Sequence, residues 1–135
     1  MKKIKKGDEV VVAIIDGSNA ARGVNMSIKN IDRWTCKCEV ISSGKKYIIV
    51  KPIENATLIY RQIKFNADNY TQFTDYSPDY ALYLSKEEVK NERIKNREYN
   101  TTFEYIYSKF NSYSKNKFTL DQLRRIKEII DEKQD

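Results

Sequence analysis

Histidine is absent from this sequence of 135 residues, and there are only two cysteines, two prolines and four glycines. Without histidine the commonest general base is missing, and a serine or cysteine triad cannot be built in the usual way. The longest apolar run near the N-terminus covers only residues 10–15, far fewer than the roughly 20 that cross a bilayer. We therefore expect a cytoplasmic protein that is not an enzyme.

The two cysteines, Cys36 and Cys38, lie two residues apart in a segment with the pattern of a strand. Their side chains should share one face, with Cβ atoms further apart than the ~4 Å that a disulfide requires. A metal site would need two more soft ligands, and the chain has none. We expect reduced, half-buried thiols and no cofactor; an intermolecular metal or redox site is the alternative.

Alternating and β-branched residues in the first half of the chain predict a small antiparallel sheet. In the second strand, Trp34 is expected on the same face as Cys36 and Cys38. Short turns between strands of this length suggest a meander that closes into an SH3-like barrel. The predicted strands are residues 8–15, 33–42, 46–51, 58–65 and 81–84.

The pattern changes near residue 85 to apolar residues at every third or fourth position. Ser85 and Glu88 fit a capping box, which predicts a helix over residues 86–110. A second capping pattern begins at Thr119 and precedes an apolar stripe over residues 120–130. We expect an α+β protein in which a β-barrel with an aromatic extension (residues 1–84) precedes a helical hairpin (residues 85–135). The hairpin would pack on the barrel or mediate assembly into a homo-oligomer.

The connection between the first two strands, residues 16–30, is too long for a hairpin turn. Unstructured loops of this length in compact domains are often functional. We identify Asn19 and Arg22 as candidate partner-binding residues, with Trp34, Tyr47 and Tyr60 as aromatic contacts. Arg22 could hold a small anion; the alternative is a structural loop in which Arg22 only packs or pairs.

Positive charge is concentrated in the first half of the chain. Residues 1–65 carry 13 basic and 6 acidic side chains, while residues 66–135 carry 12 basic and 13 acidic ones. A cationic barrel with exposed aromatic rings could hold a phosphate backbone and stack bases. Barrels of this size also bind proteins, and exposed lysines often serve solubility alone. The candidate phosphate contacts are Lys37, Lys45, Lys46, Lys51, Arg61 and Lys64.

Motifs for catalysis are not convincing. The segment 17–23 has glycines and an arginine but lacks the lysine–hydroxyl pair of a P-loop. Asp79, Glu88 and Lys90 superficially match a metal-dependent nuclease, but Glu88 and Lys90 fall in a capped helix instead of on a strand beside the first acid.

Six short stretches, spread over almost the whole chain, form a recognisable combination. They are KKGDEVVV at 5–12, NAARG at 19–23, EVISSGKKYIIV at 39–50, IKF at 63–65, DYSPDYALYLSKEE at 75–88 and FTLDQLRRIKEII at 118–130. In this order they resemble a group of small β-barrel domain proteins encoded by phages and prophages of low-GC Gram-positive bacteria. The resemblance implies a phage accessory protein made in the host cytoplasm, and it implies no activity, cofactor or catalytic residue.

Two functions follow from these observations. The first is a non-enzymatic accessory protein that blocks or sequesters a host component, such as a defence effector or its nucleotide signal; a host protein or a small anionic nucleotide would then be the partner. The second is a barrel that binds nucleic acid through its basic face. Binding through phosphates should weaken steeply as salt rises, which separates the two.

Overall fold

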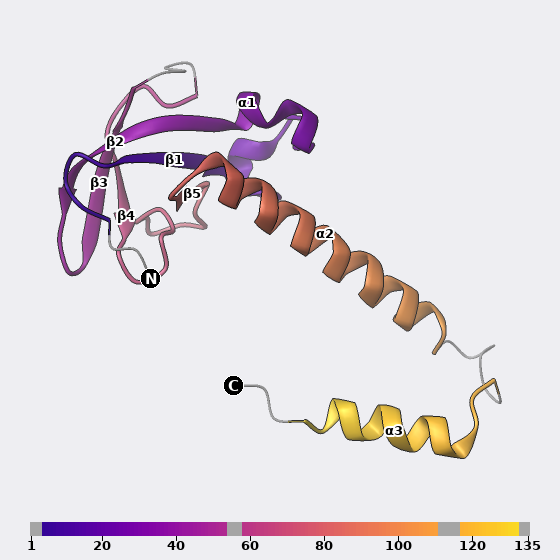
Figure 1. Ribbon diagram of the computed structural model, residues 1–135. Coiled ribbons are helices and arrows are strands. Elements are labelled where there is room, and N and C mark those ends of the chain that lie inside the picture. Colours follow the sequence, from indigo (N-terminus) through magenta and orange to yellow (C-terminus); the bar gives the residue numbers. More distant parts are fainter. Residues whose placement is uncertain (1–3, 54–57, 111–116, 133–135) are drawn as a thin grey trace. The chain divides into compact units, whose positions relative to one another are not determined.

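The computed structural model describes residues 4–53, 58–110 and 117–132. The chain divides into two compact units, Met1–Ile94 and Lys95–Asp135, and the boundary falls within helix α2 (Lys86–Ser108). In Figure 1 the five strands precede the two long helices. The other elements are β1 (Glu9–Ile14), η1 (Asn19–Ala21), η2 (Ile28–Asn30), α1 (Ile31–Trp34), β2 (Thr35–Ser43), β3 (Tyr47–Pro52), β4 (Ile63–Asn66), β5 (Tyr80–Tyr83) and α3 (Leu120–Ile130).

The strands form one antiparallel sheet in the order β4-β3-β2-β1-β5, which curls into a nearly closed barrel. A register shift between Val40 and Ser42 on β2 marks a bulge, and bulges increase the local twist that a small barrel needs. The segment that follows β4 narrows the remaining gap. Phe73 N donates to Lys64 O of β4, and Leu82 N of β5 donates to Tyr70 O, both at 2.8 Å. The sequence prediction of an α+β protein with a small antiparallel barrel is confirmed.

Tyr70 has the positive backbone angle φ of 60° that non-glycine residues seldom adopt. Its amide donates to Asn66 O at 2.9 Å, so the chain reverses direction directly after β4. This turn lets Tyr70–Phe73 run back between β4 and β5. The local backbone cost at Tyr70, on the order of 1–2 kcal/mol, is offset by the barrel hydrogen bonds that it allows.

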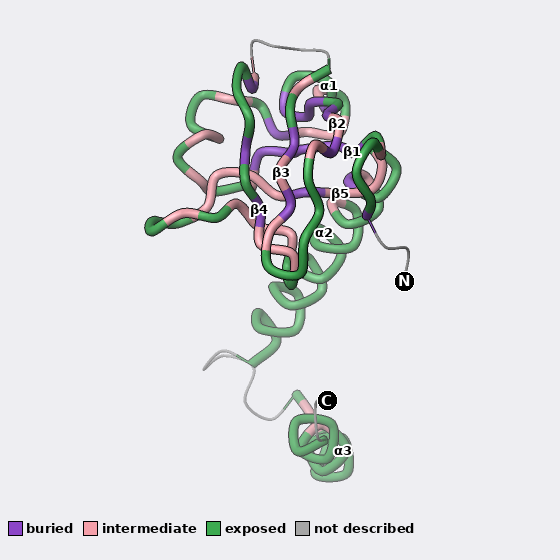
Figure 2. Tube along the Cα trace, turned by 90° about the vertical axis from the view of Figure 1, so that its left-hand side faces the viewer, coloured by how far each residue is buried: buried purple, intermediate pink, exposed green. Residues whose placement is uncertain are grey.

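Inward-facing side chains fill the barrel with a tightly buried core. Val12, Cys38, Val50 and Phe65 are each fully buried, and Leu82 of β5 is 2% exposed. Because side chains alternate along a strand, every second residue of β1 to β4 reaches this core. Figure 2 shows the buried residues gathered on the strands of the first unit.

A second apolar cluster covers the outer face of β1. Val11 and Ala13 point outward there and pack with Met26 and Trp34, and with Val89 of α2. The first turns of α2 therefore belong to the barrel unit, which extends to Ile94. These contacts hold the start of α2 against the sheet.

Trp34 is not on the face that we predicted. It ends the short helix α1, where the backbone turns by about 100° per residue in place of the 180° alternation of a strand. Its ring joins the outer cluster, while Cys36 and Cys38 face the barrel interior. The indole Nε1 donates to Ser27 O at 2.9 Å, and the residue is only 2% exposed.

The strand predicted for residues 58–65 is wrong in its first half, because β4 begins only at Ile63. In the antiparallel register, Val50 pairs with Ile63, so a longer β4 would have to pair with Pro52. Proline has no backbone N–H to donate, and the ladder ends there. Ile59 is nevertheless buried in the core.

Side-chain caps begin both long helices. At α2, Ser85 Oγ accepts from Glu88 N at 3.2 Å, while the Glu88 carboxylate accepts from Leu84 N instead of Ser85 N. At α3, Thr119 and Gln122 form the complete reciprocal capping box. Among the residues that the structure describes, no helix is long and apolar enough to span a bilayer.

Candidate functional site

A lysine lies against a pair of contacting aromatic rings on the outer surface of β3 and β4. Lys64 Nζ is 4.6 Å from the ring centroid of Tyr47 and 5.4 Å from that of Phe73. The two rings meet edge to face, with centroids 4.9 Å apart and planes at 70°. A cation within about 6 Å of a ring face is attracted by the electrons of the ring, so the three side chains hold one another in position.

The strand pattern explains why these side chains face outward. On β3, Ile48 and Val50 fill the barrel, so Tyr47 and Lys51 point outward. On β4, Ile63 and Phe65 face inward, which leaves Lys64 outside and exposed. We call this surface the β3–β4 face and define it by Lys45, Lys46, Tyr47, Lys51, Lys64 and Phe73.

Positive charge dominates the β3–β4 face. Residues 44–51 and 60–66 contain five basic residues and no acidic one. Of the five, Lys51 lies 3.8 Å from Glu39 of β2 at the border of the face. Because both partners are about half exposed, this pair is worth at most about 1 kcal/mol and leaves Lys51 available to a stronger anion.

Tyr60 and Arg61 form a second pair of a ring and a cation, just before β4. The guanidinium carbon of Arg61 is 5.7 Å from the Tyr60 ring centroid, and Tyr60 is 77% exposed. Their side chains also influence Tyr80 of β5. Burial raises the pKa of Tyr80 above its ordinary value, Asp79 and Tyr60 raise it further, and Arg61 opposes them.

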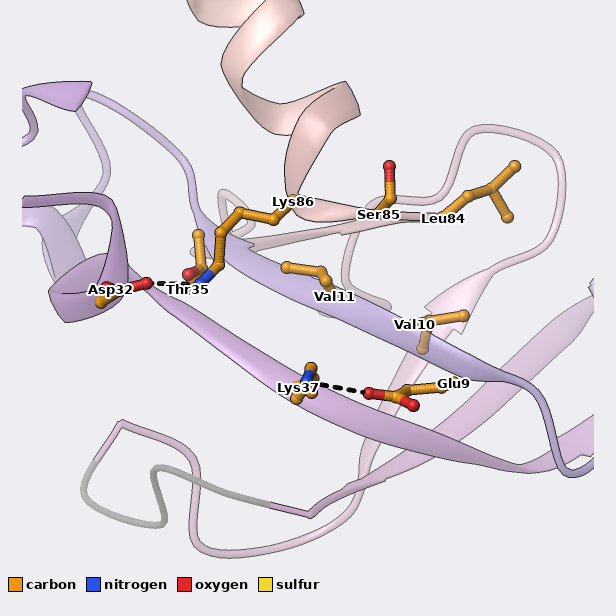
Figure 3. A pocket seen from close by; sticks show the side chains of 9 residues that line it. All are labelled: Glu9, Val10, Val11, Asp32, Thr35, Lys37, Leu84, Ser85 and Lys86. Carbon is orange, nitrogen blue, oxygen red and sulfur yellow. Dashed lines mark hydrogen bonds and ion pairs between the residues drawn. The ribbon is translucent and has the colours of Figure 1, made fainter. Parts of the chain in front are cut away.

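Lys37 lies elsewhere, in a pocket of about 500 Å³ on the outer face of β1 and β2. Figure 3 shows its ammonium directed toward Glu9, at 3.4 Å, and Lys86 of α2 directed toward Asp32 of α1. The hydrogen bond and charge of Lys86 hold the pKa of the Asp32 carboxyl below its usual value.

The charges in this pocket balance, because two ammonium groups face two carboxylates. A phosphate entering it would compete with Glu9 and Asp32 for the same cations. Lys37 therefore does not belong to the β3–β4 face. Of the six predicted phosphate contacts, four lie on that face, Lys37 lies in the pocket, and Arg61 lies against Tyr60.

The connection between β1 and β2 is anchored to α2 by Arg93. Its Nη1 donates to Asp16 Oδ2 at 2.9 Å, and its Nη2 donates to Met26 O at 2.7 Å. The guanidinium also lies 5.7 Å from the Trp34 ring centroid. The connection, which contains η1 and η2, is thus a structured element with a fixed course.

Asn19 and Arg22 are both exposed on this anchored connection. Ala20 N donates to Asp79 Oδ1 at 3.1 Å, which fixes the backbone between them. Trp34, expected beside them as a contact, is buried and cannot touch a partner without local opening. The loop therefore offers the polar side chains of Asn19 and Arg22 to a partner, and Trp34 adds no aromatic contact beside them.

The structure thus brings some predicted residues together and separates others. Tyr47 and Lys64 meet, and Lys45, Lys46 and Lys51 lie on the same strand or its turn. Phe73 was not predicted as a site residue, because only the return of the chain after Tyr70 places it beside β4. Its position in the aromatic segment, between Tyr70 and Tyr76, was the available signal.

In residues 4–53, 58–110 and 117–132, no three His, Cys, Asp or Glu side chains converge. The β3–β4 face offers ammonium groups and ring faces, which suit an anionic ligand with planar groups.

Comparison with known proteins gives one finding. A family model described as Phage ProQ C-terminal-like domain matches residues 1–133. No curated protein matches the chain. No solved structure matches it either.

Proposed function

Because the chain belongs to the Phage ProQ C-terminal-like domain family, we propose that this phage-associated domain acts by binding and that its β3–β4 face takes single-stranded nucleic acid. The observation that carries the proposal is the Tyr47–Lys64–Phe73 cluster, in which an ammonium group lies 4.6 and 5.4 Å from the centroids of two rings that contact each other, next to the further lysines of β3 and its turn. Single strands offer unstacked bases to rings and phosphates to lysines, and both kinds of contact are required of such a site.

We also propose that the barrel is SH3-like and that the phage infects a low-GC Gram-positive bacterium. In this proposal the protein works in the cytoplasm of that host, without catalysing a reaction or using a cofactor. The short turns between the strands support the barrel type, and the resemblance of six sequence stretches to small phage β-barrel proteins supports the rest.

The ring of Phe73 should contribute measurably to the affinity for a single strand. Stacking of one base on an aromatic side chain is worth about 1–3 kcal/mol by alanine substitution. Phe73 is 47% exposed, so Phe73→Ala should weaken binding of a fluorescent single strand by roughly 5- to 150-fold. Fluorescence anisotropy at fixed salt measures the loss.

The lysine contribution is read from the salt dependence. For single strands, the slope of log K against log salt falls by roughly 0.7 for each phosphate contact that is lost. Lys64→Gln should therefore flatten the slope by about that amount, while Lys37→Gln, the matched control from the charge-balanced pocket, should leave it unchanged. Equal effects of the two variants, or no binding of DNA or RNA at low salt, would rule out the proposal.

A second function is favoured by the anchored loop. Asn19 and Arg22 are exposed on a backbone that Arg93 and Asp79 hold in place. A rigid surface with exposed polar side chains suits a protein that blocks a host defence effector or sequesters its nucleotide signal. A pull-down of the tagged protein from host cells, with mass spectrometry of proteins and nucleotides, tests it. A partner lost with Arg22→Ala and kept with Phe73→Ala would assign it to the loop.

A further inference from the structure

We propose that the second unit joins two copies of this chain, through a bundle of four helices built from the second half of α2 and from α3 of each copy. The proposal is independent of what the β3–β4 face binds. It starts from the second unit, Lys95–Asp135, in which none of the described residues is buried.

Large apolar side chains in this unit are left exposed at 44–73%. Four aromatic ones on one side of α2 and directly after it, Tyr99, Phe103, Tyr107 and Phe110, alone present roughly 500 Å², if a ring residue offers about 150–250 Å². That area is a large part of the ~800 Å² that each partner contributes to a standard interface. The remaining large apolar side chains are Ile106 in α2, and Leu120, Leu123, Ile129 and Ile130 in α3, while Tyr105 lies on the opposite side of α2 and is not counted.

The width of the apolar surface on α3 indicates how many neighbouring helices are needed to cover it. At about 100° per residue, Leu120 and Ile129 lie on opposite sides of the helix, and the other apolar residues fill the half-circle between them. One neighbouring helix covers a much narrower stripe. A hairpin of α3 with its own α2 would leave Leu120 or Ile129 in water, whereas each helix of a four-helix bundle has two neighbours.

The surface of α2 in this unit fits the same arrangement. Tyr99, Phe103 and Ile106 share one side of the helix and line an open groove of about 370 Å³. Tyr107 stacks on Phe103, with ring centroids 6.3 Å apart, and so widens the apolar surface to one flank. The groove receives a helix on one side, and the flank offers contact to a second.

Charge favours a second copy over a charged partner. Residues 95–135 carry nine basic and seven acidic side chains, so two copies meet without strong repulsion. The ion pairs Arg125–Asp121, at 3.4 Å, and Lys127–Asp131, at 3.0 Å, satisfy charges within α3 itself. A partner recognised by charge would find little here to bind, and an identical apolar surface fits better.

The test is the mass of the full chain by size exclusion with light scattering, after nuclease treatment and at high salt, where nucleic-acid bridging is lost and apolar contacts persist. We expect twice the chain mass of 15.9 kDa. Ile129→Gln should raise the dimer dissociation constant by about tenfold or more, while Arg124→Gln, to the same residue on the polar side of α3, should not change it.

Circular dichroism of Ile129→Gln checks that α3 keeps its helix, since glutamine is at least as good a helix former as isoleucine. Hydrogen exchange then separates the remaining outcomes. A monomer with protected α3 amides would mean that α3 packs on its own α2, and a monomer with unprotected amides would mean that nothing covers it. Either monomer, a larger assembly, or equal effects of the two variants would overturn the proposal.

Discussion

Replacing Arg93 with methionine should release the connection between β1 and β2 from helix α2. The side chain of Arg93 is 22% exposed, and it contacts Asp16, Met26 O and the ring of Trp34 together. Methionine keeps most of the apolar stem but donates no hydrogen bond. The substitution therefore removes the polar anchor with little loss of packing.

The cost follows from the three contacts. The charged hydrogen bond to Met26 O is worth about 1.5–3 kcal/mol, and the contact with the Trp34 ring about 0.5–1 kcal/mol. The ion pair adds less than about 1 kcal/mol, since Asp16 is largely exposed. We expect the free energy of unfolding to fall by roughly 2–4 kcal/mol, which for a unit of this size lowers the melting temperature by on the order of 10 °C or more.

Trp34 is the only tryptophan in the chain and lies in the affected cluster, so its fluorescence in urea unfolding reports the loss. Asp16→Asn is the matched control, because it removes only the exposed ion pair and should cost under about 1 kcal/mol. An Arg93→Met protein within about 0.5 kcal/mol of the wild type would refute this account of the anchored loop.

Three further predictions concern the barrel core and its titrating groups. Phe65→Ala should cost about 3–5 kcal/mol in urea unfolding, because Phe65 is fully buried, and a cost below about 2 kcal/mol would contradict the barrel core. Cys36 and Cys38 are 2% and 0% exposed, and burial raises the pKa of Cys38. Both thiols should therefore react with a thiol reagent only as fast as the protein unfolds. Complete labelling of the native protein within minutes would argue against this. Burial, then Glu92, raises the pKa of Tyr83, so its contribution to stability is complete below pH about 10 and is lost as the pH rises. Tyr83→Phe should flatten the fall in unfolding free energy above that pH, and an unchanged alkaline slope would count against the assignment.

The fold was predictable where a local pattern decided it. β1, β3 and α3 follow from β-branched runs, alternation and capping residues, which act over a few positions of the chain. The failures arose where distant residues decide. β4 begins at Ile63 because Pro52 ends the hydrogen-bond ladder on the neighbouring strand. The pattern of residues 58–65 by itself does not indicate this start. Trp34 lies on the opposite face from the predicted one, because the single helical turn of α1 interrupts the alternation of side chains before β2.

The candidate site was predictable in composition and not in arrangement. The lysines and Tyr47 were visible in the sequence, yet Lys37 has the same local pattern as Lys64. Only the strand register places Lys37 beside Glu9 and Lys64 beside Phe73. Phe73 depends on the chain reversal at Tyr70, which is a property of the folded barrel.

The hydrogen bonds of Tyr70–Phe73 to β4 and β5 have a consequence for recognition. The two outermost strands of a sheet are where an extended peptide usually adds itself as an extra strand. In the described part of the barrel, this segment already occupies main-chain groups of both. A peptide that approached these two strands would therefore contact side chains instead of extending the sheet.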